Sequence, residues 1–252
     1  MPSAQTVWGN SVAILTGDLL FARASQLMAS LGERAIRMQA STFERLVLGQ
    51  LHETVGPSEG DDPVAHYTQV LADKTGSLIA AAAQSGLVFS GADPGFEAPI
   101  MEFGEKVGVA FQLIDDVIDL SPQPEETGKV PGTDLRAGVV TLPLLRLVEL
   151  AKTDAASADL LKRIERDVIV VTDPADGGDP FDTNTLASRI VPSRKTVDAI
   201  VAELRDHEAT RATLAEAHRW AREAVKSLAP LPEGGVKKAL TRFAETIVER
   251  QS

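Results

Sequence analysis

Three aspartates lie close together in the 252-residue chain, in a stretch that reads GVAFQLIDDVIDL. On a helix, Asp115 and Asp119 share one face and Asp116 flanks them. Their neighbours are mostly apolar, and no Lys or Arg lies within one turn. Carboxylates in such surroundings need positive compensation, which Mg²⁺ supplies while completing its shell with water and phosphate oxygens. An acidic stripe on a solvated helix face is the alternative, and three aspartates taken alone favour it.

Two lysines lie within two residues of a glycine and are candidates for binding a phosphate group. Lys129 lies downstream in TGKVPGTDL, and a glycine-rich loop beside a helix end can bring a lysine and backbone N–H groups to a phosphate. Lys74 begins the sequence Lys74-Thr75-Gly76 inside an Ala-rich stretch. A single lysine on a helix is normally a surface residue, but Gly76 would allow close approach there. At this point a metal and phosphate site and ordinary surface lysines beside a solvated acidic stripe are both open.

Helices are expected to position these residues. Aromatic residues make up only 4% of the chain, and few segments alternate with the period of two that is typical of strands. Apolar residues instead recur at helical spacing, as in the stripes Val197, Ile200, Val201, Leu204 and Val236, Leu240, Phe243, Ile247. Gly- and Pro-rich breakers separate the predicted helices, which are 11–31, 34–55, 64–90, 96–120, 142–152, 157–171, 194–228 (broken once) and 234–250.

The pattern predicts a single all-α domain over residues 1–252. Thr141 before Leu142-Pro143 suits a helix start, and Asp61-Asp62 suits a loop and helix cap. Residues 172–184 (TDPADGGDPFDTN) are rich in Asp, Gly and Pro. Their spacing does not match an EF-hand calcium loop, so a surface loop is expected.

Composition excludes several classes of function. Lys and Arg total 25 against 36 Asp and Glu, a net charge of −11, which argues against general nucleic-acid binding. The absence of cysteine excludes disulfides, thiolate metal sites and cysteine nucleophiles. No apolar run is expected to cross a bilayer, and the start of the chain lacks the features of a secretory signal. We therefore expect a soluble, cytoplasmic protein without a transmembrane segment.

The motifs together resemble those of the trans-isoprenyl diphosphate synthases, the polyprenyl synthetase family, and in particular the bacterial medium- and long-chain enzymes. The resemblance is carried by Lys74-Thr75-Gly76, by FQLIDDVID from Phe111 to Asp119, and by TGKVPGTDLRAGVVTLP from Thr127 to Pro143. Softer matches are GDLL from Gly17 and the pair Gly49-Gln50. The motifs occur in the family's order from the first predicted helix onwards.

The resemblance implies an isoprenoid synthase-type helical bundle around a central cavity, usually homodimeric. It also implies Mg²⁺-dependent condensation of an allylic diphosphate with isopentenyl diphosphate in isoprenoid biosynthesis. By this resemblance Asp115 and Asp116 bind metal, with Asp119 as ligand or support. Lys74 and Lys129 contact the allylic diphosphate. Thr75 and Gln112 occupy positions that support the carbocation or steady the site.

The chain also departs from the family pattern. The family's first Asp-rich motif, its GGKRxRP-type site for isopentenyl diphosphate and a basic pair are not found, so we expect the N-terminal helices of the fold to be missing. We therefore expect little or no synthase activity from this chain alone. A late gene start, a truncation or completion by another chain would each explain this. Val139 stands where many members carry Lys.

Two other functions stay open. One is a non-catalytic partner or regulatory subunit of a prenyl diphosphate synthase. The other is a terpene cyclase-like helical enzyme, against which GKVPGTDL and the lack of a second metal motif both argue.

Product length is not predictable, because in the family it depends on residues that precede the first Asp-rich motif.

Overall fold

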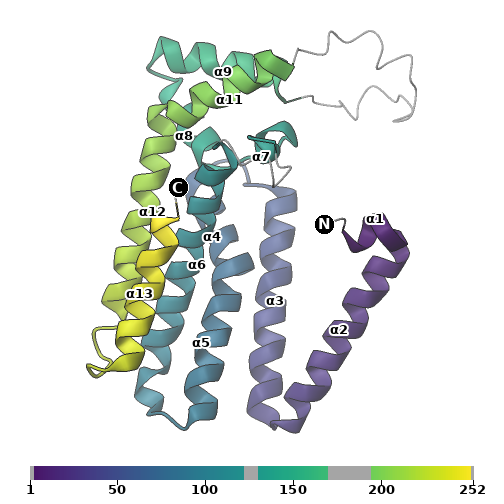
Figure 1. The fold of residues 1–252 in the computed structure, drawn as a ribbon, viewed down its shortest axis with the longest axis vertical. Coiled ribbons are helices and arrows are strands. Elements are labelled where there is room, and N and C mark those ends of the chain that lie inside the picture. The colour runs from purple at the N-terminus through teal and green to yellow at the C-terminus, as the bar shows by residue number, and fades with distance from the viewer. Residues whose placement is uncertain (1–2, 122–129, 170–193, 251–252) are drawn as a thin grey trace.

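The structure is a computed structural model that describes residues 3–121, 130–169 and 194–250, and every regular element in these ranges is a helix (Figure 1). The predicted all-α class is therefore confirmed. Six helices run along the bundle in the order α3 (Glu33–Val55), α4 (Pro63–Leu71), α5 (Ser77–Ser90), α6 (Glu97–Asp119), α12 (Glu208–Ser227) and α13 (Gly235–Glu249). The remaining helices are α1 (Ala4–Trp8), α2 (Asn10–Ser30), α7 (Thr133–Arg136), α8 (Leu142–Leu150), α9 (Ala155–Asp167) and α11 (Arg194–Asp206), with a 3₁₀ turn at Pro94–Phe96.

The predicted start signals position their helices as expected. The Asp62 side chain accepts a hydrogen bond from the backbone N–H of Val64, and Pro63 opens α4. Helix α8 begins at Leu142 after Thr141, with a proline in its first turn. The predicted helix 64–90 is continuous, but its middle is a π-helical turn, η1 (Ala72–Gly76), which the periodicity did not reveal.

Helix α6 lies at the centre of the bundle and carries the aspartates. Its residues Phe103, Val107 and Leu113 are almost completely buried, and it packs mainly on α5 and α12. The approach to α5 and η1 depends on glycine. A Cβ at Gly108 would lie 2.5 Å from the Cα of Gly76, and one at Gly104 would lie 2.5 Å from the Cα of Ala80. These small residues let the aspartate helix and the lysine turn come into backbone contact.

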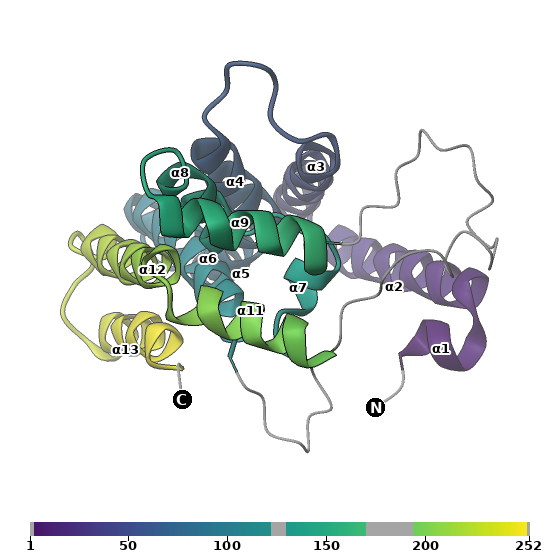
Figure 2. The same ribbon diagram turned by 90° about the horizontal axis from the view of Figure 1, so that it is seen from above.

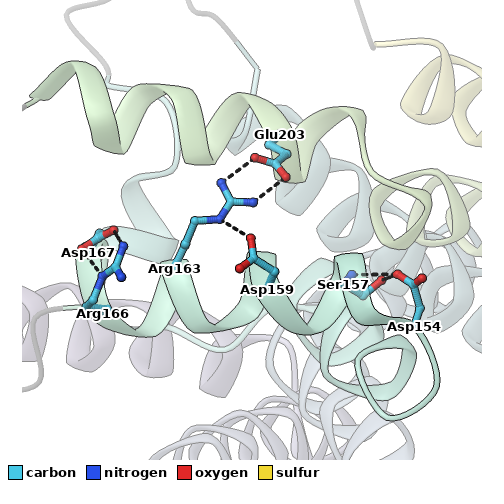
Figure 3. Close-up of polar contacts among 7 residues, drawn as sticks. All are labelled: Asp154, Ser157, Asp159, Arg163, Arg166, Asp167 and Glu203. Carbon is cyan, nitrogen blue, oxygen red and sulfur yellow. Dashed lines mark hydrogen bonds and ion pairs between the residues drawn. The ribbon is translucent and has the colours of Figure 1, made fainter.

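A second apolar cluster closes one end of the bundle, where α9 and α11 lie across the other helices (Figure 2). The predicted stripe on α11 is confirmed, because Val197, Ile200, Val201 and Leu204 are all buried in this cluster. On its outer side, the two helices are joined by a bidentate ion pair between Arg163 and Glu203, with Nη–Oε distances of 2.7 and 2.8 Å (Figure 3).

The predicted stripe on α13 is partly wrong. Of its four members only Ile247 is buried, while Val236 and Phe243 are exposed. Helix α13 contacts α12 and α6 and buries Ala244, Ile247 and Val248 instead. The contact face is therefore rotated, and small Ala244 rather than Phe243 meets the neighbouring helices.

Helix α2 diverges from the bundle and buries none of its side chains (Figure 1). Contrary to the sequence-based expectation, it is long and apolar enough to cross a membrane by length and composition alone. One such helix near the N-terminus is weak evidence for a membrane span, because core helices of soluble proteins and signal sequences meet the same test. The predicted surface loop at 172–184 lies outside the described residues.

Candidate functional site

A cavity of about 780 Å³ opens between the C-terminal end of α3, helices α4, η1 and α6, and the segment that leads into α8. Three of the predicted site residues line it: Lys74, Gln112 and Asp116. Its other charged side chains are Glu53 and Asp134. The cavity therefore has more carboxylates than cations, and it would receive a diphosphate only together with additional positive charge.

Lys74 lies on the π-helical turn η1, a type of distortion that is often found at functional sites. Its Nζ makes an ion pair with Oε2 of Glu53 at 2.7 Å. Helix α3 approaches this turn closely, because a Cβ at Gly49 would lie 3.0 Å from the backbone nitrogen of Lys74. The lysine is thus held at the cavity wall by a carboxylate that a phosphate group could replace.

A partly buried ion-pair network fixes the other side of the same turn. Arg45 contacts Oδ1 of Asp73 through Nε and Oε2 of Glu105 through Nη1, both at 2.5 Å. Gln69 donates a further hydrogen bond to Asp73 at 2.9 Å. Asp73 directly precedes Lys74 in the chain. These contacts therefore link α3, α4, η1 and α6 next to the lysine.

Asp116 is the most buried of the three aspartates, with only 6% of its surface exposed. The Tyr67 hydroxyl donates a hydrogen bond to its Oδ2 at 2.8 Å. Burial raises the pKa of Asp116 to about 7, although the Tyr67 hydroxyl and the backbone N–H of Leu142 oppose the shift. Burial and the Asp116 carboxylate likewise raise the pKa of Tyr67 well above its usual range, so its hydroxyl stays a donor.

Asp119 holds the segment that follows α6. Its Oδ2 accepts a hydrogen bond from the backbone N–H of Asp134 at 3.1 Å, and its carbonyl accepts one from Gly132 at 2.7 Å. Asp115 and Asp119 are both half-buried. Of the three aspartates only Asp116 lines the cavity, whereas Asp115 and Asp119 do not. Carboxylate oxygens of this kind are the ligands that Mg²⁺ prefers.

Within the described ranges, however, no three His, Asp or Glu side chains are grouped so that they could hold a metal ion by themselves. A magnesium ion at these aspartates would therefore need further ligands from water and a phosphate. This is the usual way in which Mg²⁺ is bound, with one or two carboxylates. The residues present fit that mode.

Not every predicted residue is brought to the cavity. Thr75 is half-buried on the π-helical turn but does not line the cavity. Lys129 lies outside the described residues. The sequence reasoning missed three contributors, Tyr67, Glu53 and Asp134. A signal for Tyr67 existed, because it is the only tyrosine of the chain and precedes Lys74 by two helical turns.

The chain is similar to known prenyl diphosphate synthases. The family model for polyprenyl synthetase matches residues 1–172. A nonaprenyl diphosphate synthase of Mycobacterium tuberculosis is 49% identical over 155 residues, which cover 62% of this chain and 46% of that protein. Component 2 of the heptaprenyl diphosphate synthase of Bacillus subtilis is 27% identical over 251 residues, covering 99% of this chain and 64% of that protein.

Among solved structures, a geranylgeranyl pyrophosphate synthase of Corynebacterium glutamicum, complexed with calcium and isoprenyl diphosphate, superimposes with a TM-score of 0.74. The two chains are 38% identical, and the match covers 98% of this chain and 69% of that one. The chain thus spans about half the length of its M. tuberculosis relative and about two thirds of the solved neighbour.

Proposed function

Because the chain belongs to the polyprenyl synthetase family, we propose that it provides the metal and diphosphate site of an all-trans polyprenyl diphosphate synthase. The reaction is the Mg²⁺-dependent condensation of an allylic diphosphate with isopentenyl diphosphate. The observation that carries this proposal is the cavity that gathers Lys74, Gln112 and Asp116. The C. glutamicum synthase was crystallised with calcium and isoprenyl diphosphate, which supports the use of a divalent cation here.

We assign each predicted residue a role in this reaction, and three of them, Lys74, Gln112 and Asp116, line the cavity. Asp115, Asp116 and Asp119 would hold Mg²⁺, which would supply positive charge to stabilise a departing diphosphate. Lys74 exchanges Glu53 for a diphosphate oxygen. By the family resemblance, Lys129 is assigned to the same diphosphate, and Thr75 and Gln112 are assigned to steadying the allylic group. The apolar side chains along the cavity, such as Val70 and Leu71, exclude water that would otherwise capture a carbocation.

The direct test is calorimetric binding of inorganic pyrophosphate to the purified chain, with and without Mg²⁺. Binding that requires Mg²⁺ and weakens at least about tenfold in Lys74→Met supports the proposal, because one charge-assisted contact is lost. Lys226→Met is the matched control, since Lys226 also pairs with a glutamate, at 2.6 Å, but lies on α12 away from the cavity. No Mg²⁺-dependent binding, or equal losses in the two variants, contradicts it.

A second candidate is a non-catalytic partner of another prenyl diphosphate synthase chain. This candidate is motivated by the B. subtilis relative, which is named as component 2 of a heptaprenyl diphosphate synthase. Incorporation of labelled isopentenyl diphosphate into an allylic diphosphate separates the two functions. Turnover by this chain supports the enzyme, whereas stimulation of another synthase without turnover supports the partner. A homodimer and a cytoplasmic location also belong to the proposal.

A further inference from the structure

We propose that helix α11 is a positioning element for the segment Val130–Val139, which is part of the connection between the aspartate helix and α8, and that Asp198 is its positioning residue. The catalytic consequence rests on the proposed function, but the structural coupling does not. The inference goes beyond the site itself, because Asp198 and the other α11 residues do not line the cavity.

The segment matters because it borders the cavity and contacts the aspartate helix. Asp134 lines the cavity, and two backbone N–H groups, those of Gly132 and Asp134, donate to Asp119. A displacement of this segment would therefore change both the position of the Asp134 carboxylate at the cavity and the two backbone hydrogen bonds to Asp119.

The segment Val130–Val139 contains little regular secondary structure that could stabilise its conformation. Its only helix, α7, has four residues, which is too short to be stable alone. Gly132 and Gly138 both have positive φ values, 71° and 73°, and glycine leaves the backbone many alternatives to these conformations. Its conformation therefore depends on contacts with other elements.

Helix α11 supplies those contacts through a charged and an apolar link. Arg136 donates from Nη2 to Oδ1 of Asp198 at 2.7 Å and from Nε to the carbonyl of Pro131 at 3.0 Å. The hydrogen bond to Asp198 thus orients the Arg136 guanidinium, which in turn binds the Pro131 carbonyl near the start of the segment. Arg194 is a weaker partner of Asp198, at 3.9 Å.

The apolar link is a close fit between Gly132 and Val201. A Cβ at Gly132 would lie 2.8 Å from Cγ2 of Val201, so the α11 side chain occupies the space beside the glycine. Leu135 is buried in the same cluster as Val201. The view along the bundle shows α7 beside α11 at this end of the molecule (Figure 2).

Hydrogen exchange of individual amides tests the coupling in the metal-free chain. In Asp198→Asn we expect the amides of Gly132 and Asp134 to exchange at least about tenfold faster than in the unmodified chain. Glu203→Gln is the matched control, because it removes an α11 carboxylate whose partner is Arg163 on α9 (Figure 3). It should leave both amides unchanged, and Asp198→Glu should restore slow exchange.

The same variants connect the coupling to function through Mg²⁺-dependent pyrophosphate binding. We expect Asp198→Asn to weaken binding several-fold and Glu203→Gln to leave it unchanged. Equal exchange rates in Asp198→Asn and the unmodified chain, or equal acceleration by Glu203→Gln, would overturn the inference. If the unmodified chain binds no pyrophosphate, the proposed function fails, while the amide comparison still decides the coupling.

Discussion

At the scale of single residues, Asp116 shows how a carboxylate can be kept almost completely buried at the wall of a cavity. It accepts hydrogen bonds from the Tyr67 hydroxyl and the backbone N–H of Leu142. These donors compensate burial only partly, since the pKa of Asp116 is still raised to about 7. A divalent cation would supply the missing positive charge, so proton and metal should compete for this carboxylate.

The raised pKa predicts a pH-dependent stability of the metal-free chain. Between about pH 4 and pH 7 the folded state keeps a proton on Asp116 that the unfolded state releases, since an unperturbed Asp has a pKa of about 3.9. The stability linked to this proton is therefore fully present below about pH 4 and is lost as pH rises through 7. Across this window, the free energy of unfolding should fall by up to about 1.4 kcal/mol per pH unit relative to Asp116→Asn.

Urea denaturation of both proteins in chelator from pH 5 to 8 measures this difference. Asp116→Asn is the suitable reference because it carries no titrating carboxyl but retains an acceptor for Tyr67. A difference between the two proteins that stays constant over the whole range would show that Asp116 titrates normally.

Tyr67→Phe removes the hydroxyl donor while keeping the ring. We expect a loss of about 1–3 kcal/mol in the free energy of unfolding at pH 8, because the buried, charged carboxylate loses a partner. At pH 6, where Asp116 is mostly protonated, the loss should be smaller. In an Asp116→Asn background the substitution should cost less as well. An equal cost in both backgrounds would mean that the negative charge of Asp116 adds nothing to the strength of this hydrogen bond.

At the scale of elements, the contact between α6 and η1 brings Asp116 and Lys74 to one cavity. Two helices rarely approach so closely, and Gly104 and Gly108 on one side meet Ala80 and Gly76 on the other. Arg45, with Asp73 and Glu105, then fixes the lysine turn against α3 and α6. Packing of small residues sets the distance, and the ion pairs set the register.

Gly108→Ala should therefore destabilise the chain by about 1–3 kcal/mol or more, because overpacking forces backbone shifts and the new Cβ would lie 2.5 Å from a backbone atom. Gly86→Ala on α5 is the matched control, since nothing lies within 4 Å of its Cβ position. It should be neutral or stabilising by up to about 1 kcal/mol, from helix propensity alone. Thermal unfolding of both variants makes the comparison, and similar midpoints would contradict the importance of the close contact.

At the scale of the whole molecule, apolar surface gathers on the first three helices. Helix α2 exposes Leu15, Leu19 and Leu20, each by about two thirds, and a helix that is apolar all round is usually buried. A surface of this kind is typical of protein–protein contact. It accords with the homodimer that the resemblance implies.

We expect the chain to self-associate through α2. Light scattering coupled to size exclusion should give a mass above 26.8 kDa, and Leu15→Lys with Leu19→Lys should shift it to that of a monomer. Val236→Lys is the control, because Val236 is an equally exposed apolar residue on α13. A monomeric unmodified chain, or dissociation by the control, would contradict a contact at α2.

The sequence by itself determined the helical class and most helix positions, because helical periodicity and caps are local properties. Its motifs also singled out Lys74, Gln112 and Asp116, which the structure places along one cavity. Residues 1–172 also carry enough of the family pattern to establish membership. The tertiary structure alone decided that Tyr67 and Glu53 line the same cavity, that Lys74 lies on a π-helical turn, and that α11 contacts the segment Val130–Val139. These features depend on contacts between residues far apart in the chain, such as Arg136 and Asp198, whose pairing no local pattern encodes.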